Sequence, residues 1–118
     1  MLRATLPPDA IFCANDHTAL IAIDVARAEF GLEVGRDISI VGFDDSALAA
    51  WGLFDLTTFS QPIEAMADMV AEIIRRQLDG HSAVVEKVVQ GQLIVRGSSR
   101  LPPTGVFGPS NRRMWRPA

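Results

Sequence analysis

The feature that most constrains the fold is a short apolar stretch that ends abruptly in polar residues. Residues 38–43, Ile-Ser-Ile-Val-Gly-Phe, lead directly into two adjacent carboxylates, Asp44 and Asp45. A second apolar stretch, residues 10–14, runs in the same way into Asn15. In open α/β sheets, ligands bind in the crevice outside the carboxyl ends of the strands. If both stretches are parallel strands, they bring Asn15 and Asp44 into one cleft.

The segment between these two strands has the pattern of an amphipathic helix. Apolar side chains recur at helical spacing over residues 17–30, Asp16 is placed to cap the first turn, and Gly31 supplies the stop. Nearly all-apolar strands joined by a helix are typical of a parallel sheet that is covered on both faces. The sequence therefore predicts an α/β fold, with a parallel sheet flanked by helices.

The remainder of the chain predicts further elements and a different kind of tail. Residues 56–61 read as an extended segment, and Pro62 opens a second helix that ends near Leu78. Two short strands are expected, one at residues 84–89 and one at residues 92–95. Order is expected to end after Arg96, and residues 101–118, rich in proline, glycine and arginine, are expected to form a disordered basic tail.

Composition excludes several classes of protein. The chain has 118 residues, of which 48% are hydrophobic and 21% charged, which suits one soluble domain with a core. It contains no apolar run long enough to span a membrane and no secretory signal at its start, so a cytoplasmic location is expected. The single cysteine, Cys13, falls in an apolar strand and is expected to be an unreactive core thiol.

Nothing in the sequence indicates an enzyme, a metal or a cofactor. Asp44 and Asp45 are adjacent on a strand and point to opposite faces, and no third carboxylate or histidine follows at ligand spacing. The glycines do not form the dinucleotide-binding fingerprint.

Four motifs in a fixed order carry a family resemblance. They are Asn15-Asp16, a helix that ends at residues 31–34, the stretch from residue 37 to Asp45, and residues 56–62, Leu-Thr-Thr-Phe-Ser-Gln-Pro. Together they resemble the C-terminal part of the effector-binding domain of LacI/GalR family transcription regulators, over roughly residues 7–100. The resemblance implies part of a periplasmic-binding-protein-like type I fold. Residues 1–100 would be a partial effector-binding domain.

The resemblance also implies a ligand site. Asn15, Asp44 and Gln61 match effector-contacting positions of that family. A carboxylate that accepts hydrogen bonds and two side-chain amides suit a sugar or a nucleobase, whose groups both donate and accept. Two alternatives remain open, namely that Asn15 bonds to local backbone and that Gln61 caps the helix begun by Pro62. Asp45 is expected to bond to loop amides instead of a ligand.

The function implied is sensing of an effector, a sugar or related small molecule, in a DNA-binding transcription regulator. Neither a DNA-reading helix-turn-helix nor the N-terminal lobe of the family is present in these residues, so contact with DNA is expected only through a domain absent here. A homodimer is expected through residues 17–30 and the apolar segment around Trp51. The alternatives are a truncated sugar-binding component of an uptake system and an assembly module without a ligand.

Overall fold

The computed structural model describes residues 2, 5, 7–81, 84, 86–109 and 112–116. These residues belong to two compact units, one containing residues 1–60 and 92–118 and the other residues 61–91. The elements of the first unit are β1 (Ala10–Phe12), α1 (Asp16–Phe30), β2 (Ser39–Asp44), the short 3-10 helix η1 (Ala47–Ala50), β3 (Thr57–Ser60), β4 (Gln92–Val95), β5 (Val106–Phe107) and β6 (Arg113–Trp115). The second unit contains the helix α2 (Ile63–Leu78).

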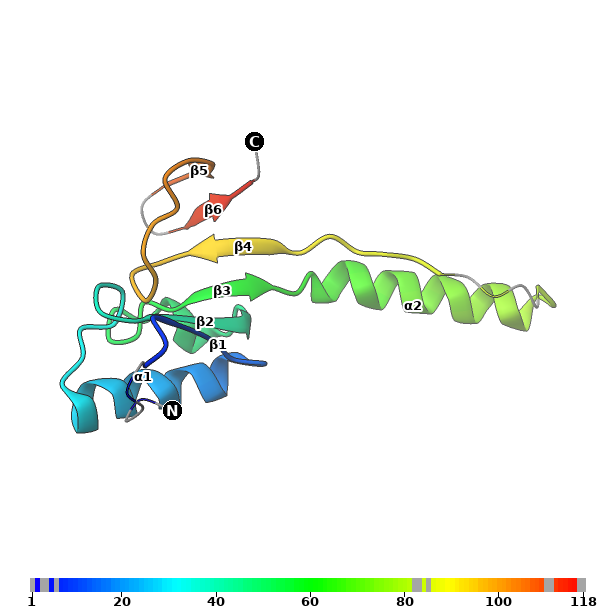
Figure 1. Ribbon diagram of the computed structural model, residues 1–118. Coiled ribbons are helices and arrows are strands. Elements are labelled where there is room, and N and C mark those ends of the chain that lie inside the picture. The colour runs from blue at the N-terminus through cyan, green and yellow to red at the C-terminus, as the bar shows by residue number, and fades with distance from the viewer. Residues whose placement is uncertain are drawn as a thin grey trace. The chain divides into compact units, whose positions relative to one another are not determined.

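The strands form one sheet in the order β1-β2-β3-β4-β6-β5 (Figure 1). The first three strands are parallel, with Phe12 opposite Val41 and Phe43 opposite Phe59. β4, β6 and β5 then continue the sheet with antiparallel pairing. The predicted α/β fold, with parallel strands and flanking helix, is confirmed.

Helix α1 forms where the apolar periodicity predicts it and buries one side. Its buried apolar residues are Ala19, Leu20, Ile23 and Ala26. The N-cap is Asn15, whose side chain accepts a hydrogen bond from the amide of Thr18, so the prediction of Asp16 as the cap is wrong by one residue. Gly31 ends the helix in the left-handed conformation (φ 63°), which glycine adopts without a steric penalty.

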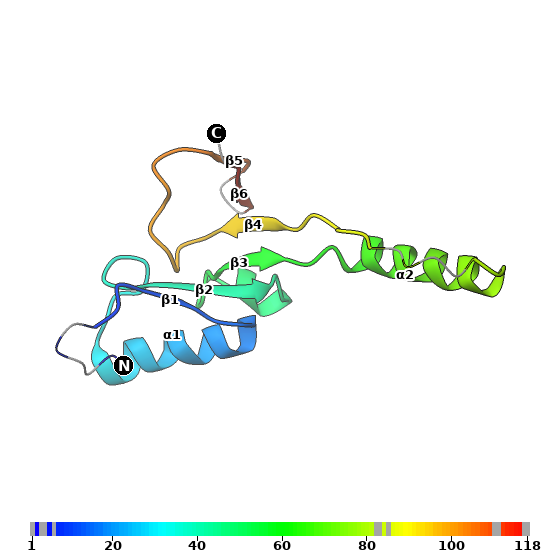
Figure 2. The ribbon, with the colours of Figure 1, turned by 45° about the vertical axis from the view of Figure 1, so that its right-hand side comes forward.

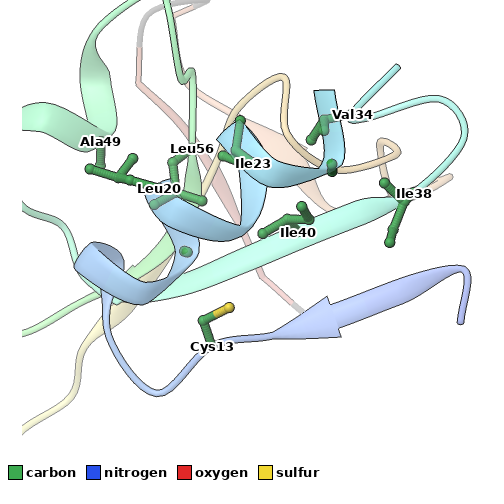
Figure 3. Close-up of a cluster of buried hydrophobic side chains, with 10 residues drawn as sticks. Cys13, Leu20, Ile23, Val34, Ile38, Ile40, Ala49 and Leu56 are labelled. Atoms are coloured by element: carbon green, nitrogen blue, oxygen red, sulfur yellow. The ribbon is translucent and has the colours of Figure 1, made fainter. Parts of the chain in front are cut away.

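The core lies between α1 and the sheet. Figure 3 shows Leu20 and Ile23 of α1 packed toward Ile40 of β2 and Leu56 before β3. Ile23, Ile40 and Leu56 are completely buried, and each such side chain stabilises the fold by roughly 1.5–3 kcal/mol. The same view shows Cys13 in this cluster, so the predicted burial of its side chain is confirmed.

Only one face of the parallel strands is covered by a helix of this unit. Figure 2 shows α1 running along one side of β1 and β2. On the other face the rings of Phe43 and Phe59 stack with centroids 5.6 Å apart, and Phe12 is 68% exposed. Among the described residues of this unit no helix lies over that face, which differs from the predicted cover on both faces.

The predictions for the C-terminal third need correction. Residues 84 and 86–89 form no strand, and residue 85 lies outside the described residues, whereas the strand expected at residues 92–95 is present as β4. The chain is also ordered beyond Arg96. The buried hydroxyl of Ser98 accepts from the amide of Thr57 (2.8 Å) and donates to the carbonyl of Ile40 (2.6 Å), which fastens this segment across the starts of two strands.

Two short strands lie within the tail that was expected to be disordered. β6 pairs with β4, with Met114 opposite Ile94, and β5 pairs with β6. The Trp115 indole nitrogen donates to the carbonyl of Thr104 (3.1 Å), and the Arg116 guanidinium lies 5.2 Å from the Phe107 ring centroid. The open edge of β4 thus provides backbone partners that tail composition does not reveal.

The second unit consists mainly of α2, which ends at Leu78 as predicted and begins at Ile63, one residue after the predicted start at Pro62. Its apolar side chains form a stripe, in which Met66, Met69, Val70 and Ile73 line a shallow groove together with Val89. No residue of α2 is buried. Among the described residues, none of the helices has the length and apolar character needed to cross a lipid bilayer.

Candidate functional site

The candidate site lies at the carboxyl ends of the parallel strands. Asn15 follows β1 after two intervening residues, and Asp44 is the last residue of the neighbouring β2. Because these strands are parallel partners, their carboxyl ends meet at the same edge of the sheet. The structure therefore brings Asn15 and Asp44 to one edge, both exposed.

The side chain of Asn15 makes a hydrogen bond to the local backbone. Its Oδ1 accepts from the amide of Thr18 at 2.8 Å, so the alternative that it bonds to local backbone is present in the structure. With that oxygen engaged, its side chain would offer a ligand chiefly the two N–H donors of the amide.

Asp44 and Asp45 stand on an unusual backbone. Their φ angles are 125° and 53°, in the region that residues with a Cβ rarely adopt. Such conformations cost of order 1–3 kcal/mol each and persist only where surrounding contacts hold them. The turn that presents Asp44 is therefore fixed by its neighbours.

Asp45 is held by an ion pair. Its Oδ1 lies 2.7 Å from Nη2 of Arg96, and the two side chains are only 13% and 7% exposed. Nη1 of Arg96 also donates to the carbonyl of Leu56 (2.8 Å), and Arg112 approaches the second oxygen of Asp45 at 3.7 Å. The expected structural role of Asp45 is confirmed, but the expected partner is wrong: a buried arginine holds its carboxylate.

Asp16 is the buried carboxylate of the site. It is 1% exposed, and its two oxygens accept from the amide of Ser46 (2.7 Å) and the hydroxyl of Thr58 (2.5 Å). The hydroxyl of Thr58 in turn accepts from the amide of Asp45 (3.3 Å). Gly42 lies against the same carboxylate so closely that a Cβ would overlap it.

Gln61 is the first residue of the second unit, and its place relative to Asn15 and Asp44 is not described. It follows Ser60, which pairs with Asp44 in the ladder between β2 and β3. Its carbonyl accepts from the amide of Ile63 at 2.9 Å. Gln61 remains a candidate on sequence grounds.

Thr58 and Arg96 were missed by the sequence reasoning, and the bridging role of Asp16 was missed with them. Each carries a weak local signal, namely a polar residue inside or beside an apolar strand. Thr58 lies within β3, level with Gly42 of β2, and Arg96 directly follows β4 and lies beside the start of β3. Partners 42 and 51 residues away cannot be inferred from local pattern.

The comparisons with known proteins agree with this fold. The model of the periplasmic binding protein-like domain family matches residues 1–99. The HTH-type transcriptional regulator MalR of Streptomyces coelicolor is 41% identical over 95 residues, which are 80% of this chain and 27% of that relative.

Two solved structures are similar over the same region. The complex of the transcriptional regulator CelR with cellobiose has a TM-score of 0.71 and 35% identity, covering 77% of this chain and 28% of that one. The lac repressor dimer bound to operator and the anti-inducer ONPF has a TM-score of 0.69 and 29% identity, covering 80% of this chain and 32% of that one. The chain thus spans about a third or less of the length of these proteins. Because they are transcription regulators, the alternative of an uptake component is not favoured.

Proposed function

The chain belongs to the family of periplasmic binding protein-like domains found in LacI-family transcription regulators, and from this premise we propose that it forms part of the effector-binding domain of such a regulator. Its ligand would be a sugar, bound at the carboxyl ends of β1 and β2 by a non-enzymatic mechanism. Binding would change the affinity of the whole regulator for its operator in the cytoplasm.

The observation that carries this proposal is the presentation of Asp44. The carboxylate is exposed at the end of β2 on a backbone that is held in a rare conformation, at the same sheet edge as Asn15. Strained backbone that its surroundings hold in place is concentrated at ligand sites. A carboxylate acceptor beside an amide donor suits adjacent sugar hydroxyls, which both donate and accept. Cellobiose in the similar CelR complex is a ligand of this class.

Calorimetry on the native full-length gene product tests the site. A panel of cellobiose, maltose, lactose and arabinose is titrated into the wild type and into Asp44→Ala, Asn15→Ala and Asp9→Ala. Loss of a charge-assisted bond at Asp44 should cost of order 1.5–3 kcal/mol, and loss of a neutral bond at Asn15 should cost less. Asp9, an exposed acid at the opposite end of β1, is the control, and Asp9→Ala should leave the sugar affinity unchanged.

Two results would count against the proposal. If no sugar of the panel binds the wild type, the ligand class is wrong. If a sugar binds and Asp44→Ala leaves its affinity unchanged, the site is wrong. Gln61→Ala, measured in the same series, tests the third candidate.

We also propose that the regulator is a homodimer through α1 and the segment that follows η1. A groove of about 360 Å³ lies between them, lined mostly by apolar side chains that include Leu20, Ile21, Leu48, Leu53 and Phe54. Leu53 is 67% exposed, and Trp51 beside it is 59% exposed. Exposed apolar surface of this kind marks association sites, and the similar lac repressor structure is a dimer.

Sedimentation of the native protein at micromolar concentration tests this surface. Trp51→Glu should shift the protein toward monomer, because it places a charge in the interface. Leu101→Glu, at a comparably exposed apolar residue of another segment, should not. A Trp51→Glu protein that still sediments as a dimer would show that this surface is not the interface.

A further inference from the structure

The two proposed ligand residues of the first unit stand on separate segments. Asn15 caps the start of α1, and Asp44 is the last residue of β2. A ligand that bonds to both side chains needs a fixed spacing between these segments. The backbone pairing of β1 and β2 ends before either residue, with Phe12 opposite Val41 and the amide of Cys13 donating to the carbonyl of Val41, so contacts beyond this ladder contribute to that spacing.

The residue directly after Asn15 makes those contacts. Asp16 is buried, and one of its oxygens accepts from the amide of Ser46, two residues beyond Asp44. Its other oxygen accepts from the hydroxyl of Thr58 on the third parallel strand. One carboxylate thus joins the start of α1, the turn that carries Asp44 and β3.

Thr58 connects the same carboxylate to the strained turn. Its side chain is completely buried, donates to Asp16 and accepts from the amide of Asp45 at 3.3 Å. The amides of Asp45 and Ser46 are therefore both fixed directly after Asp44, whose φ of 125° requires such support. Gly42 allows this arrangement, since a side chain there would overlap the Asp16 carboxylate.

From these bonds we propose that Asp16 and Thr58 are positioning residues, which hold Asn15 and Asp44 at the spacing the effector requires. The inference rests on the proposed function, in which Asp44 binds the effector. Asp16 itself is too buried to contact a ligand, and its effect passes through Asn15 and Asp44. An asparagine in its place can accept from the amide of Ser46 only with its own N–H2 group toward Thr58, so Asp16→Asn removes the acceptor of the Thr58 hydroxyl.

A double-mutant cycle separates positioning from general stability. The wild type, Asp16→Asn, Asp44→Ala and the double variant are titrated with whichever panel sugar binds the wild type most tightly. Asp16→Asn should lower affinity about tenfold, the usual worth of one buried hydrogen bond. In the double variant the loss should equal that of Asp44→Ala alone, because the carboxylate to be positioned is gone.

A second readout needs no ligand. Amide hydrogen exchange at residues 44–46 of the native full-length gene product should be faster in Asp16→Asn than in the wild type, while exchange elsewhere in the sheet stays the same. Unchanged exchange at these amides would overturn the proposal, as would additive losses in the cycle. Failure of the proposed function would give a different result. Asp44→Ala would then leave sugar affinity unchanged, while amide exchange at residues 44–46 would still respond to Asp16→Asn.

Thr58 supplies a matched pair of variants in case Asp16→Asn fails to fold by circular dichroism. Thr58→Ser keeps the hydroxyl and should retain affinity and slow exchange. Thr58→Val keeps the shape and loses both bonds, so it should lower affinity and speed exchange at residues 44–46. Equal behaviour of the two variants would contradict the positioning role. Asp9→Asn, an exposed acid changed to its amide, is the control.

Discussion

Replacing Arg96 with methionine should be one of the most damaging single changes in the first unit. The side chain of Arg96 is 7% exposed, and its Nη2 lies 2.7 Å from Oδ1 of Asp45, which is 13% exposed. Nη1 donates to the carbonyl of Leu56 at 2.8 Å. Methionine fills much of the same volume and provides neither the charge nor these donors.

The expected cost follows from what the substitution leaves behind. Removing one partner of a buried ion pair costs about 3–5 kcal/mol, because the other charge stays buried without compensation. Arg112 can relieve part of this, since it already lies 3.7 Å from the second oxygen of Asp45, so the lower end of that range is expected. Against a total stability of about 5–15 kcal/mol, this is a large fraction.

Urea unfolding of the native full-length gene product, followed by the fluorescence of Trp51 and Trp115, measures the cost. The double variant Arg96→Met/Asp45→Asn should recover part of the loss, because no buried charge is then left unpaired. Arg36→Met is the control, since its side chain is 68% exposed and an exposed ion pair adds little stability. If Arg96→Met costs no more than Arg36→Met, the buried pair does not stabilise the turn.

Three further predictions concern stability and reactivity. Gly42→Ala should cost about 1–3 kcal/mol in urea unfolding, because its Cβ would overlap a buried carboxylate, whereas Gly52→Ala, with open space around it, should be near neutral. Burial raises the pKa of the Cys13 thiol, so a disulfide reagent at pH 8 should modify it only as fast as the protein unfolds; rapid modification of the native protein would refute this. The hydrogen bond from Arg36 lowers the pKa of Asp37, so its stabilising effect is present above about pH 4 and lost as pH falls below it, and Asp37→Asn should flatten the acid side of the stability curve.

The elements that the sequence predicted well are those whose signals are local. The apolar periodicity of residues 17–30, the stop at Gly31 and the proline that opens α2 each act within one or two helical turns. The polar residues at the ends of β1 and β2 were predictable for the same reason, because each lies within a few residues of the apolar strand that precedes it. These local signals sufficed to place Asn15 and Asp44 at one sheet edge.

The errors arise where distant partners decide between two local possibilities. Asp16 and Asn15 are both good caps by residue type, and the choice depends on Ser46 and Thr58, which engage the Asp16 carboxylate from 30 and 42 residues away. Residues 84–89 have strand composition, yet those of them that the structure describes form no strand, and it is β6 from the tail that pairs with β4.

Gly42 shows how such a distant partner changes the meaning of a local residue. Within a strand, glycine weakens the sheet and by composition alone suggests a bulge or a break. Here the strand continues through Gly42. The Asp16 carboxylate fills the space that a Cβ would occupy, which explains why the residue is a glycine. The glycine weakens the strand locally, but it leaves room for the polar network that holds the turn after β2. Local rules are broken where a protein binds or switches, so a glycine inside an apolar strand that ends in a carboxylate indicates a buried polar group beneath it.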